Sequence, residues 1–293
     1  MQFLDPRNDV AFKKIFGSEA HKQVTISFLN SILEKTGSRA IAEIQFLNTE
    51  QKRIIRNKKD NILDILCTDQ SCNRYIVEMQ VDRVKAFDKR MVYYGAKTYA
   101  MQLNKKQSYI KLAPVVVVAI LDFVMFPHKK NYKSIHKFFD DKTFEQDLGE
   151  LTFAFVELTK FSKKENELVS AEDKWLYFIK QISKEDHIPA SLAQGEFEDA
   201  CHVAERMAWS EEELNDYDDA IVRATDAQGA LELAIEEGLA KGEAKGEARG
   251  EAKGEEKKAI KIARNMLNAG IDVATIAKTT DLSIETIEEL ANN

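Results

Sequence analysis

The sequence predicts an α/β protein, a mixed β-sheet flanked by helices, with an all-α C-terminal tail. Two observations indicate this fold class. In the front half, stretches with apolar residues at three- and four-residue spacing alternate with short apolar runs rich in β-branched residues, the pattern of helices alternating with strands. After about residue 165 only helical spacing remains. With 293 residues, 44% of them hydrophobic, the chain can build one good-sized core and additional elements.

The order of the elements follows from these patterns. The predicted helices of the front half are 8–17, 19–35 and 85–103. The predicted strands are 40–47, 61–67, 74–81, 113–123 and 151–161. The valine-rich run in the fourth strand is apolar without alternation, which indicates a strand covered on both faces. The core order is therefore αβββαβ, with one more strand after it.

The stretch NILDILCTDQSCNRYIVEMQV (61–81) reads as two strands joined by a polar turn, with Asp64 on the first and Glu78 on the second. If the hairpin pairs about Ser71, Asp64 lies opposite Glu78, and opposed side chains have Cβ atoms about 4.5–5.5 Å apart. Two carboxylates that close together among apolar neighbours repel each other, and a divalent cation relieves the repulsion. The alternative is that one acid is exposed on an edge strand, or that a nearby lysine neutralises each acid.

Asp64, followed about fourteen residues later by Glu-x-Gln and then a helix, resembles the PD-(D/E)XK nuclease core. More specifically, the segments FLDPRNDVAFKKIFG, IVEMQ and KRMVYYGAKTYAMQL resemble the bacterial recombination-promoting nuclease and putative transposase family of the Rpn type. The resemblance implies a restriction-endonuclease-like fold with an αβββαβ core. It also implies a metal-dependent DNA endonuclease that promotes DNA recombination or transposition-like events.

The resemblance also implies roles for single residues. Asp64 and Glu78 match the metal-binding acids, with Mg²⁺ as the expected ion and Ca²⁺ or Mn²⁺ as alternatives. Gln80 stands where the motif usually has lysine, and an amide can hydrogen-bond but carries no charge. Either Gln80 positions the attacking water, or the chain is a catalytically weak or inactive nuclease-fold protein that binds DNA or a partner. Asp9 matches an acid that some of these nucleases place near the metal, and a helix N-cap is the other interpretation.

Basic residues near the acids are candidate DNA contacts. Just upstream of Asp64 these are Arg53, Arg56, Lys58 and Lys59, and on the helix 85–103 they are Arg90 together with Tyr93. A solvated loop and a plain amphipathic surface are the respective alternatives. Residues 1–150 carry a net charge of +7 and residues 151–293 carry −14, which favours a polyanion partner for the front half. No element resembles a base-reading helix, so we expect low sequence specificity.

The predicted domains are a nuclease-like domain at 1–185, a helical acidic connection at 186–235, a repeat at 236–258 and a small helical module at 259–293. The repeat has glycine at every fourth residue. It reads either as a helix that a second copy can approach closely, which would give a homo-oligomer through the tail, or as a flexible charged linker. The last unit has helix-turn-helix spacing, but its second helix carries glutamates and no base. We therefore expect an interaction module there.

We expect a cytoplasmic location without a membrane partner. No apolar run approaches the roughly 20 residues that span a bilayer, and the N-terminal segment has charges where a signal peptide is apolar. Three cysteines without a ligand spacing suit a reducing compartment.

Overall fold

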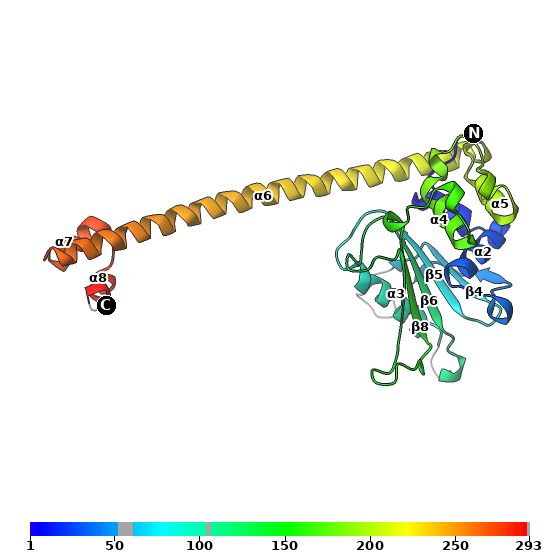
Figure 1. Ribbon diagram of the computed structural model, residues 1–293, viewed down its shortest axis with the longest axis horizontal. Coiled ribbons are helices and arrows are strands. Elements are labelled where there is room, and N and C mark those ends of the chain that lie inside the picture. The colour runs from blue at the N-terminus through cyan, green and yellow to red at the C-terminus, as the bar shows by residue number, and fades with distance from the viewer. Residues whose placement is uncertain (52–60, 104–106, 292–293) are drawn as a thin grey trace. The chain divides into compact units, whose positions relative to one another are not determined.

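The computed structural model describes residues 1–51, 61–103 and 107–291. By their internal contacts these residues form two compact units, Met1–Val222 and Arg223–Asn293. The first unit contains a six-stranded sheet with helices on both of its faces (Figure 1). The mixed α/β fold predicted from the sequence is confirmed.

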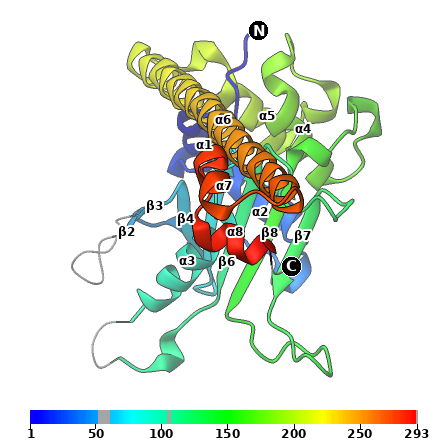
Figure 2. The same cartoon turned by 90° about the vertical axis from the view of Figure 1, so that its left-hand side faces the viewer.

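The strands are β1 (Ile44–Phe46), β2 (Glu50–Gln51), β3 (Asn61–Ile62), β4 (Ile65–Asp69), β5 (Arg74–Gln80), β6 (Val115–Leu121), β7 (Lys133–Lys137) and β8 (Leu151–Glu157). In the six-stranded sheet the order is β1-β4-β5-β6-β8-β7. The three strands β5, β6 and β8 are parallel, whereas β1, β4 and β7 pair antiparallel with their neighbours. Strands β2 and β3 form a separate two-stranded ribbon, which continues along the chain into β4 (Figure 2).

The α-helices are α1 (Asp9–Phe16), α2 (Lys22–Ile32), α3 (Phe87–Ala100), α4 (Ala171–Gln181), α5 (Gly195–Ala204), α6 (Glu211–Asn268), α7 (Val273–Thr280) and α8 (Ile284–Ala291). Short 3-10 turns lie at Glu19–His21, Gly37–Arg39, Tyr109–Lys111, Leu158–Lys160, Glu165–Glu167, Ile182–Lys184, Ala190–Leu192 and Arg206–Ala208.

Alternate residues of β6 enter two separate hydrophobic cores. Val118 and Ile120 belong to the larger core, which also contains residues of α1, α2, α4 and α5. Val117 and Ala119 belong to a second core beneath α3, which covers the opposite face of the sheet (Figure 1). The predicted strand 113–123 is therefore covered on both faces, and this explains why its residues are apolar without alternation.

The predicted strand 61–67 is not continuous. Leu63 and Leu66 are both buried in the core beneath α3, but side chains three positions apart point to opposite faces of a regular strand. The backbone therefore bends at Asp64 and separates β3 from β4. Ile62, just before the bend, is 66% exposed and is therefore not one of the apolar neighbours that surround Asp64.

Strand β7 was not predicted because its sequence, KSIHK, has no buried apolar alternation. Its central Ile135 is 41% exposed. Backbone pairing with β8, from Lys133 opposite Val156 to Lys137 opposite Thr152, holds this strand at the edge of the sheet. A strand is predicted from its pattern of buried apolar side chains, and β7 has no such pattern because backbone hydrogen bonds, not side-chain burial, hold it in the sheet.

In the second unit the residues 236–258 are helical as part of α6. The end of α6 packs with α7 and α8 around Ala263, Ile276 and Ile287. The chain turns between these helices at two residues with positive φ, Gly270 (75°) and Asp281 (55°). Among the described residues, no helix has both the length and the apolar composition that crossing a membrane requires.

Candidate active site

The two acids of the hairpin face each other as the sequence predicts. Ile65 pairs with Val77 and Leu66 with Ile76, a register that places Asp64 opposite Glu78. The amide of Met79 donates to Oδ2 of Asp64 at 2.9 Å, and the amide of Asp64 donates to Oε1 of Glu78 at 3.1 Å. Each carboxylate is thus oriented by the backbone of the opposite segment.

Both acids are withdrawn from water. Glu78 is 6% exposed, and the side chain of Asp64 is 17% exposed. Burial raises the pKa of Asp64, and the nearby charge of Asp9 raises it further. Burial also raises the pKa of Glu78, and the charge of Asp64 adds to this. A buried pair of carboxyl groups of this kind takes up a proton or a cation readily.

Lys13 on α1 contributes a positive charge that we did not predict. Its Nζ atom lies 3.5 Å from Oδ1 of Asp64 and 2.6 Å from Oδ1 of Asp9. Asp9 is not the N-cap of α1, because Asn8 fills that position and accepts a hydrogen bond from the amide of Val10. The signal in the sequence was the four-residue spacing between Asp9 and Lys13, which puts both side chains on one face of a helix.

Gln80 lies near Arg90 of α3. The guanidinium of Arg90 donates through Nη2 to Oε1 of Gln80, and it also lies over the ring of Phe87, 4.7 Å from its centroid. The Nε atom of Arg90 is buried and has no hydrogen-bond partner among the described residues. Gln80 is therefore held by a cation on a helix, rather than left free at the end of its strand.

The tyrosine close to the acids is Tyr94, which was not among the predicted site residues. Burial raises the pKa of Tyr94, and the charge of Glu78 raises it further. The predicted residue Tyr93 also lies on α3 but is 40% exposed. The guanidinium of Arg90 lies over the ring of Tyr94, 5.9 Å from its centroid. Tyr93 and Tyr94 follow Arg90 by three and four positions, both of which are same-face spacings on a helix, so spacing along the chain does not distinguish the two tyrosines.

The four cations predicted upstream of Asp64, namely Arg53, Arg56, Lys58 and Lys59, lie outside the described residues.

Asp64 and Glu78 are suited to a hard divalent cation. Within the described ranges, no group of three or more His, Cys, Asp or Glu side chains could enclose a metal ion. Mg²⁺ does not require such a cage, because it is commonly bound by one or two carboxylates together with waters and a substrate phosphate. Within the described part of the chain Lys13 forms an ion pair with Asp64 and Glu78 forms none, and the pKa of Glu78 stays raised although Arg90 and Lys13 lower it. The negative charge of the pair is therefore only partly compensated. The donor set therefore fits an ion of this class.

The mixed sheet, with two acids on adjoining strands and Glu-x-Gln at the end of β5, defines the PD-(D/E)XK class of nuclease folds. Residues 6–234 match the model of the PD-(D/E)XK nuclease family transposases, and the chain belongs to this family. Residues 256–292 match the C-terminal helix-turn-helix domain of the Rpn/YhgA-like nuclease family. No curated protein and no solved structure matches the chain.

These matches confirm the resemblance seen in the sequence. They also bear on the partner of the chain. Helix-turn-helix units are a common DNA-binding architecture, and the match over residues 256–292 therefore indicates DNA as a partner.

Proposed function

We propose that this chain is a metal-dependent DNA endonuclease that hydrolyses phosphodiester bonds with low sequence specificity and acts in recombination or transposition-like events. Membership of a nuclease family supports the reaction class. The observation that carries the proposal is the facing pair Asp64 and Glu78, because Glu78 is buried, Asp64 is only 17% exposed, and both have a raised pKa. A cation would offset this unfavourable concentration of negative charge.

In the proposed reaction Asp64 and Glu78 would hold a divalent ion, Mg²⁺ or, in its place, Ca²⁺ or Mn²⁺. When bound, such an ion polarises the phosphate and lowers the pKa of a coordinated water. The hydrogen bond from the Met79 amide keeps the Asp64 carboxylate in one orientation. Because this donor belongs to the backbone of β5, the orientation is set by the pairing of the strands.

Lys13 takes over the charge that the motif lysine would supply. Gln80 is neutral, and its side-chain oxygen already accepts from Arg90, so it cannot compensate for negative charge on a phosphate. The Lys13 ammonium is 3.5 Å from Asp64, so it would lie beside a phosphate bound through an ion at Asp64. A fixed cation at that position stabilises the transition state more than the ground state. Asp9, which pairs with Lys13, acts by positioning the ammonium.

DNA contacts are proposed for two groups of residues. Arg53, Arg56, Lys58 and Lys59 would neutralise phosphates on the approach to the acids. The second group is on α3. Tyr93 is 40% exposed and could contact a DNA strand, and Arg90, which donates to Gln80, would contact a phosphate bound near Gln80.

Low sequence specificity is supported by the charge of the helix-turn-helix unit. Its second helix, α8, exposes Glu285 and Glu288, and these charges make this helix unsuited to reading bases in a groove lined by phosphates, even where other surfaces contact DNA. We propose that the C-terminal tail also mediates homo-oligomerisation, with α6 as the element that brings two copies together.

The second candidate function is a nuclease-fold protein that binds DNA or a protein partner without cutting. Gln80 in place of the motif lysine favours it. The two candidates differ in one measurable property, the dependence of phosphodiester cleavage on Asp64.

The test is nicking of supercoiled plasmid by the full chain with Mg²⁺, Mn²⁺, Ca²⁺ or EDTA. We expect nicking that requires a divalent ion and falls at least about 100-fold in Asp64→Asn and Glu78→Gln, while Asp141→Asn, a change at an exposed acid, leaves it intact. Calorimetric titration of the same proteins gives a second readout, since both active-site variants should lose an ion-binding event. Equal nicking by Asp64→Asn and wild type would overturn the endonuclease assignment.

A further inference from the structure

A pocket opens after the ends of β5, the strand that carries Glu78, and β6. Its volume is about 510 Å³, and it is lined by residues 83–88 from the connection between β5 and α3 and by Phe123, Met125 and Phe126 after β6. The two strands are parallel, so their carboxyl ends meet at one edge of the sheet, where ligand crevices of open α/β sheets commonly lie. The volume is in the range of small-ligand pockets.

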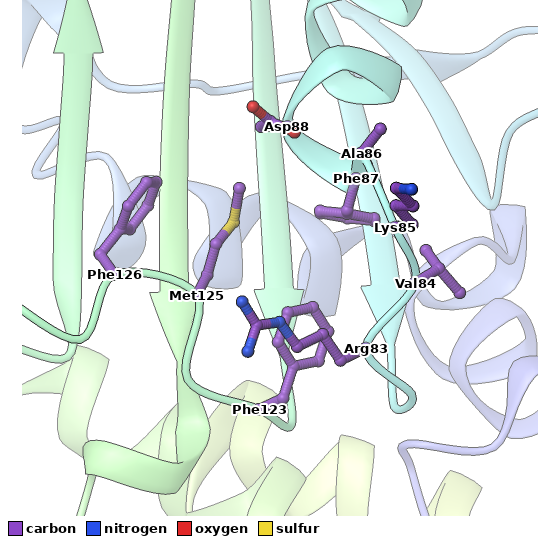
Figure 3. Close-up of a pocket in the computed structure, with 9 residues that line it drawn as sticks. All are labelled: Arg83, Val84, Lys85, Ala86, Phe87, Asp88, Phe123, Met125 and Phe126. Atoms are coloured by element: carbon purple, nitrogen blue, oxygen red, sulfur yellow. The ribbon is translucent and has the colours of Figure 1, made fainter. Parts of the chain in front are cut away.

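The walls of the pocket combine aromatic rings with cations. Phe87, Phe123 and Phe126 line its interior, and the side chains of Met125 and Phe126 lie across the space from Phe87 (Figure 3). Arg83 and Lys85 are exposed at the rim and form no ion pair within the described part of the chain. Asp88 also lines the pocket, in the first turn of α3, where the helix dipole favours a negative charge.

The pocket shares a wall with the candidate active site. Phe87 lies at van der Waals distance from the Arg90 guanidinium that holds Gln80, and its other neighbour is Phe123, with ring centroids 6.1 Å apart. Phe87 is thus connected through Arg90 to Gln80, which follows Glu78 by two residues on β5. A DNA strand with one phosphate at Asp64 and Glu78 would therefore extend its adjoining nucleotide toward these rings.

Rings on the inside with cations at the rim suit a nucleotide whose base has left its stack. Aromatic side chains stack on any base, and cations bind the adjoining phosphates. A base in a perfect duplex must first be unpaired and turned out, which costs a few kcal/mol, whereas a base in single-stranded or mismatched DNA is already available.

We propose that this pocket binds an unstacked nucleotide next to the phosphate that is cut, and that the preferred substrate is therefore single-stranded or locally unpaired DNA. This inference rests on the proposed endonuclease function, and it adds the substrate class. Phe123 supplies the stacking surface, and Arg83 and Lys85 bind the neighbouring phosphates.

The test measures DNA binding by the full chain in EDTA, where cleavage does not interfere. The probes are one fluorescein-labelled oligonucleotide as a single strand, as a perfect duplex and as a duplex with one central mismatch. We expect tighter binding of the single strand and the mismatched duplex than of the perfect duplex. Phe123→Leu, which keeps most of the apolar volume, should weaken single-strand binding about tenfold and leave perfect-duplex binding unchanged.

Arg83→Gln serves as a second variant outside the core. It should weaken single-strand binding and lower the slope of log K against log salt by about 0.7. Phe144→Leu and Lys142→Gln, at exposed positions remote in sequence, are the matched controls and should bind as wild type does. Equal binding of single strand and duplex by wild type, or wild-type binding by both pocket variants, would overturn the proposal.

The experiments distinguish a wrong pocket assignment from a wrong endonuclease assignment. A protein that nicks plasmid in an Asp64-dependent way without preferring unpaired DNA keeps the proposed function and overturns the pocket assignment. A protein that binds single strands through Phe123 but never nicks supports the pocket and overturns the endonuclease.

Discussion

The Nζ atom of Lys13 lies 3.5 Å from Oδ1 of Asp64, although Lys13 belongs to α1 and Asp64 to the bend before β4. The helix thereby brings a cation to a Glu-x-Gln site whose own motif contains none. This relationship explains how a chain with Gln80 in place of lysine can still compensate for charge on a phosphate.

Lys13→Met should lower the plasmid-nicking rate about 100-fold, because a cation near the developing charge is lost. Lys13→Arg should keep a larger share of the activity. DNA binding in EDTA and the melting temperature should change little, which separates a role in the reaction from a role in folding. Lys22→Met, at an exposed lysine on α2, is the control. Unchanged nicking together with tighter Mg²⁺ binding by Lys13→Met would show instead that this lysine only competes with the ion.

The raised pKa of Glu78 predicts a stability that depends on pH in a definite direction. The folded protein holds a proton on this carboxyl at a higher pH than the unfolded chain does. Its contribution to folding stability is therefore present at acid pH and is lost as pH rises through the folded-state pKa. In EDTA, Glu78→Gln should melt at nearly the same temperature as wild type near pH 5 and roughly 2–4 °C higher at alkaline pH.

The measurement is a melting series across pH with and without Mg²⁺. The ion should remove the difference at alkaline pH by stabilising wild type alone. Glu43→Gln, at an exposed glutamate, should follow wild type throughout. A gap that is constant across pH would contradict the raised pKa.

Restoring the motif lysine should not improve the enzyme. In Gln80→Lys an ammonium would face the guanidinium of Arg90, which now donates to Gln80, and the repulsion of two cations at the edge of the core should cost at least about 1 kcal/mol. We expect lower stability in urea unfolding and no gain in nicking. The double variant with both Gln80→Lys and Arg90→Gln should recover the stability and raise the nicking rate. A tenfold gain from Gln80→Lys alone would show that Arg90 does not control this position.

The proposed oligomer predicts a contact face on α6. Leu231, Ile235 and Leu239 are each more than half exposed and recur every fourth residue, and Gly242 and Gly246 continue the same face. In a single copy such a stripe remains in water, whereas a second helix would cover it. Ile235→Ser with Leu239→Ser should reduce the mass measured by light scattering, and Glu237→Ser on the opposite face should not. A monomeric wild type at micromolar concentration would contradict the contact.

Much of the fold follows from local patterns. The helix at 8–17, the valine-rich strand at 113–123 and the breaks near Gly270 and Asp281 were predictable because periodicity and turn residues encode them directly. The hairpin register was predictable for the same reason, since the turn near Ser71 and the alternation of both strands permit one pairing.

Other features depended on contacts between distant elements. The bend at Asp64 exists because Leu63 and Leu66 are drawn into one core, and nothing in the local alternation signals this. Strand β7 exists because β8 offers a free edge, not because its own residues are apolar. Tyr94 rather than Tyr93 lies near the acids because α3 turns its buried face toward β5.

The sequence by itself therefore determined the αβββαβ order of the core, the facing pair Asp64 and Glu78, and the missing lysine at Gln80. The tertiary structure alone decided which cation lies beside them. Phe12, Ile15 and Phe16 are completely buried, and their packing fixes the rotation of α1 about its axis. Because that rotation depends on the shape of the whole core, the approach of Lys13 to Asp64 cannot be read from spacing along the chain.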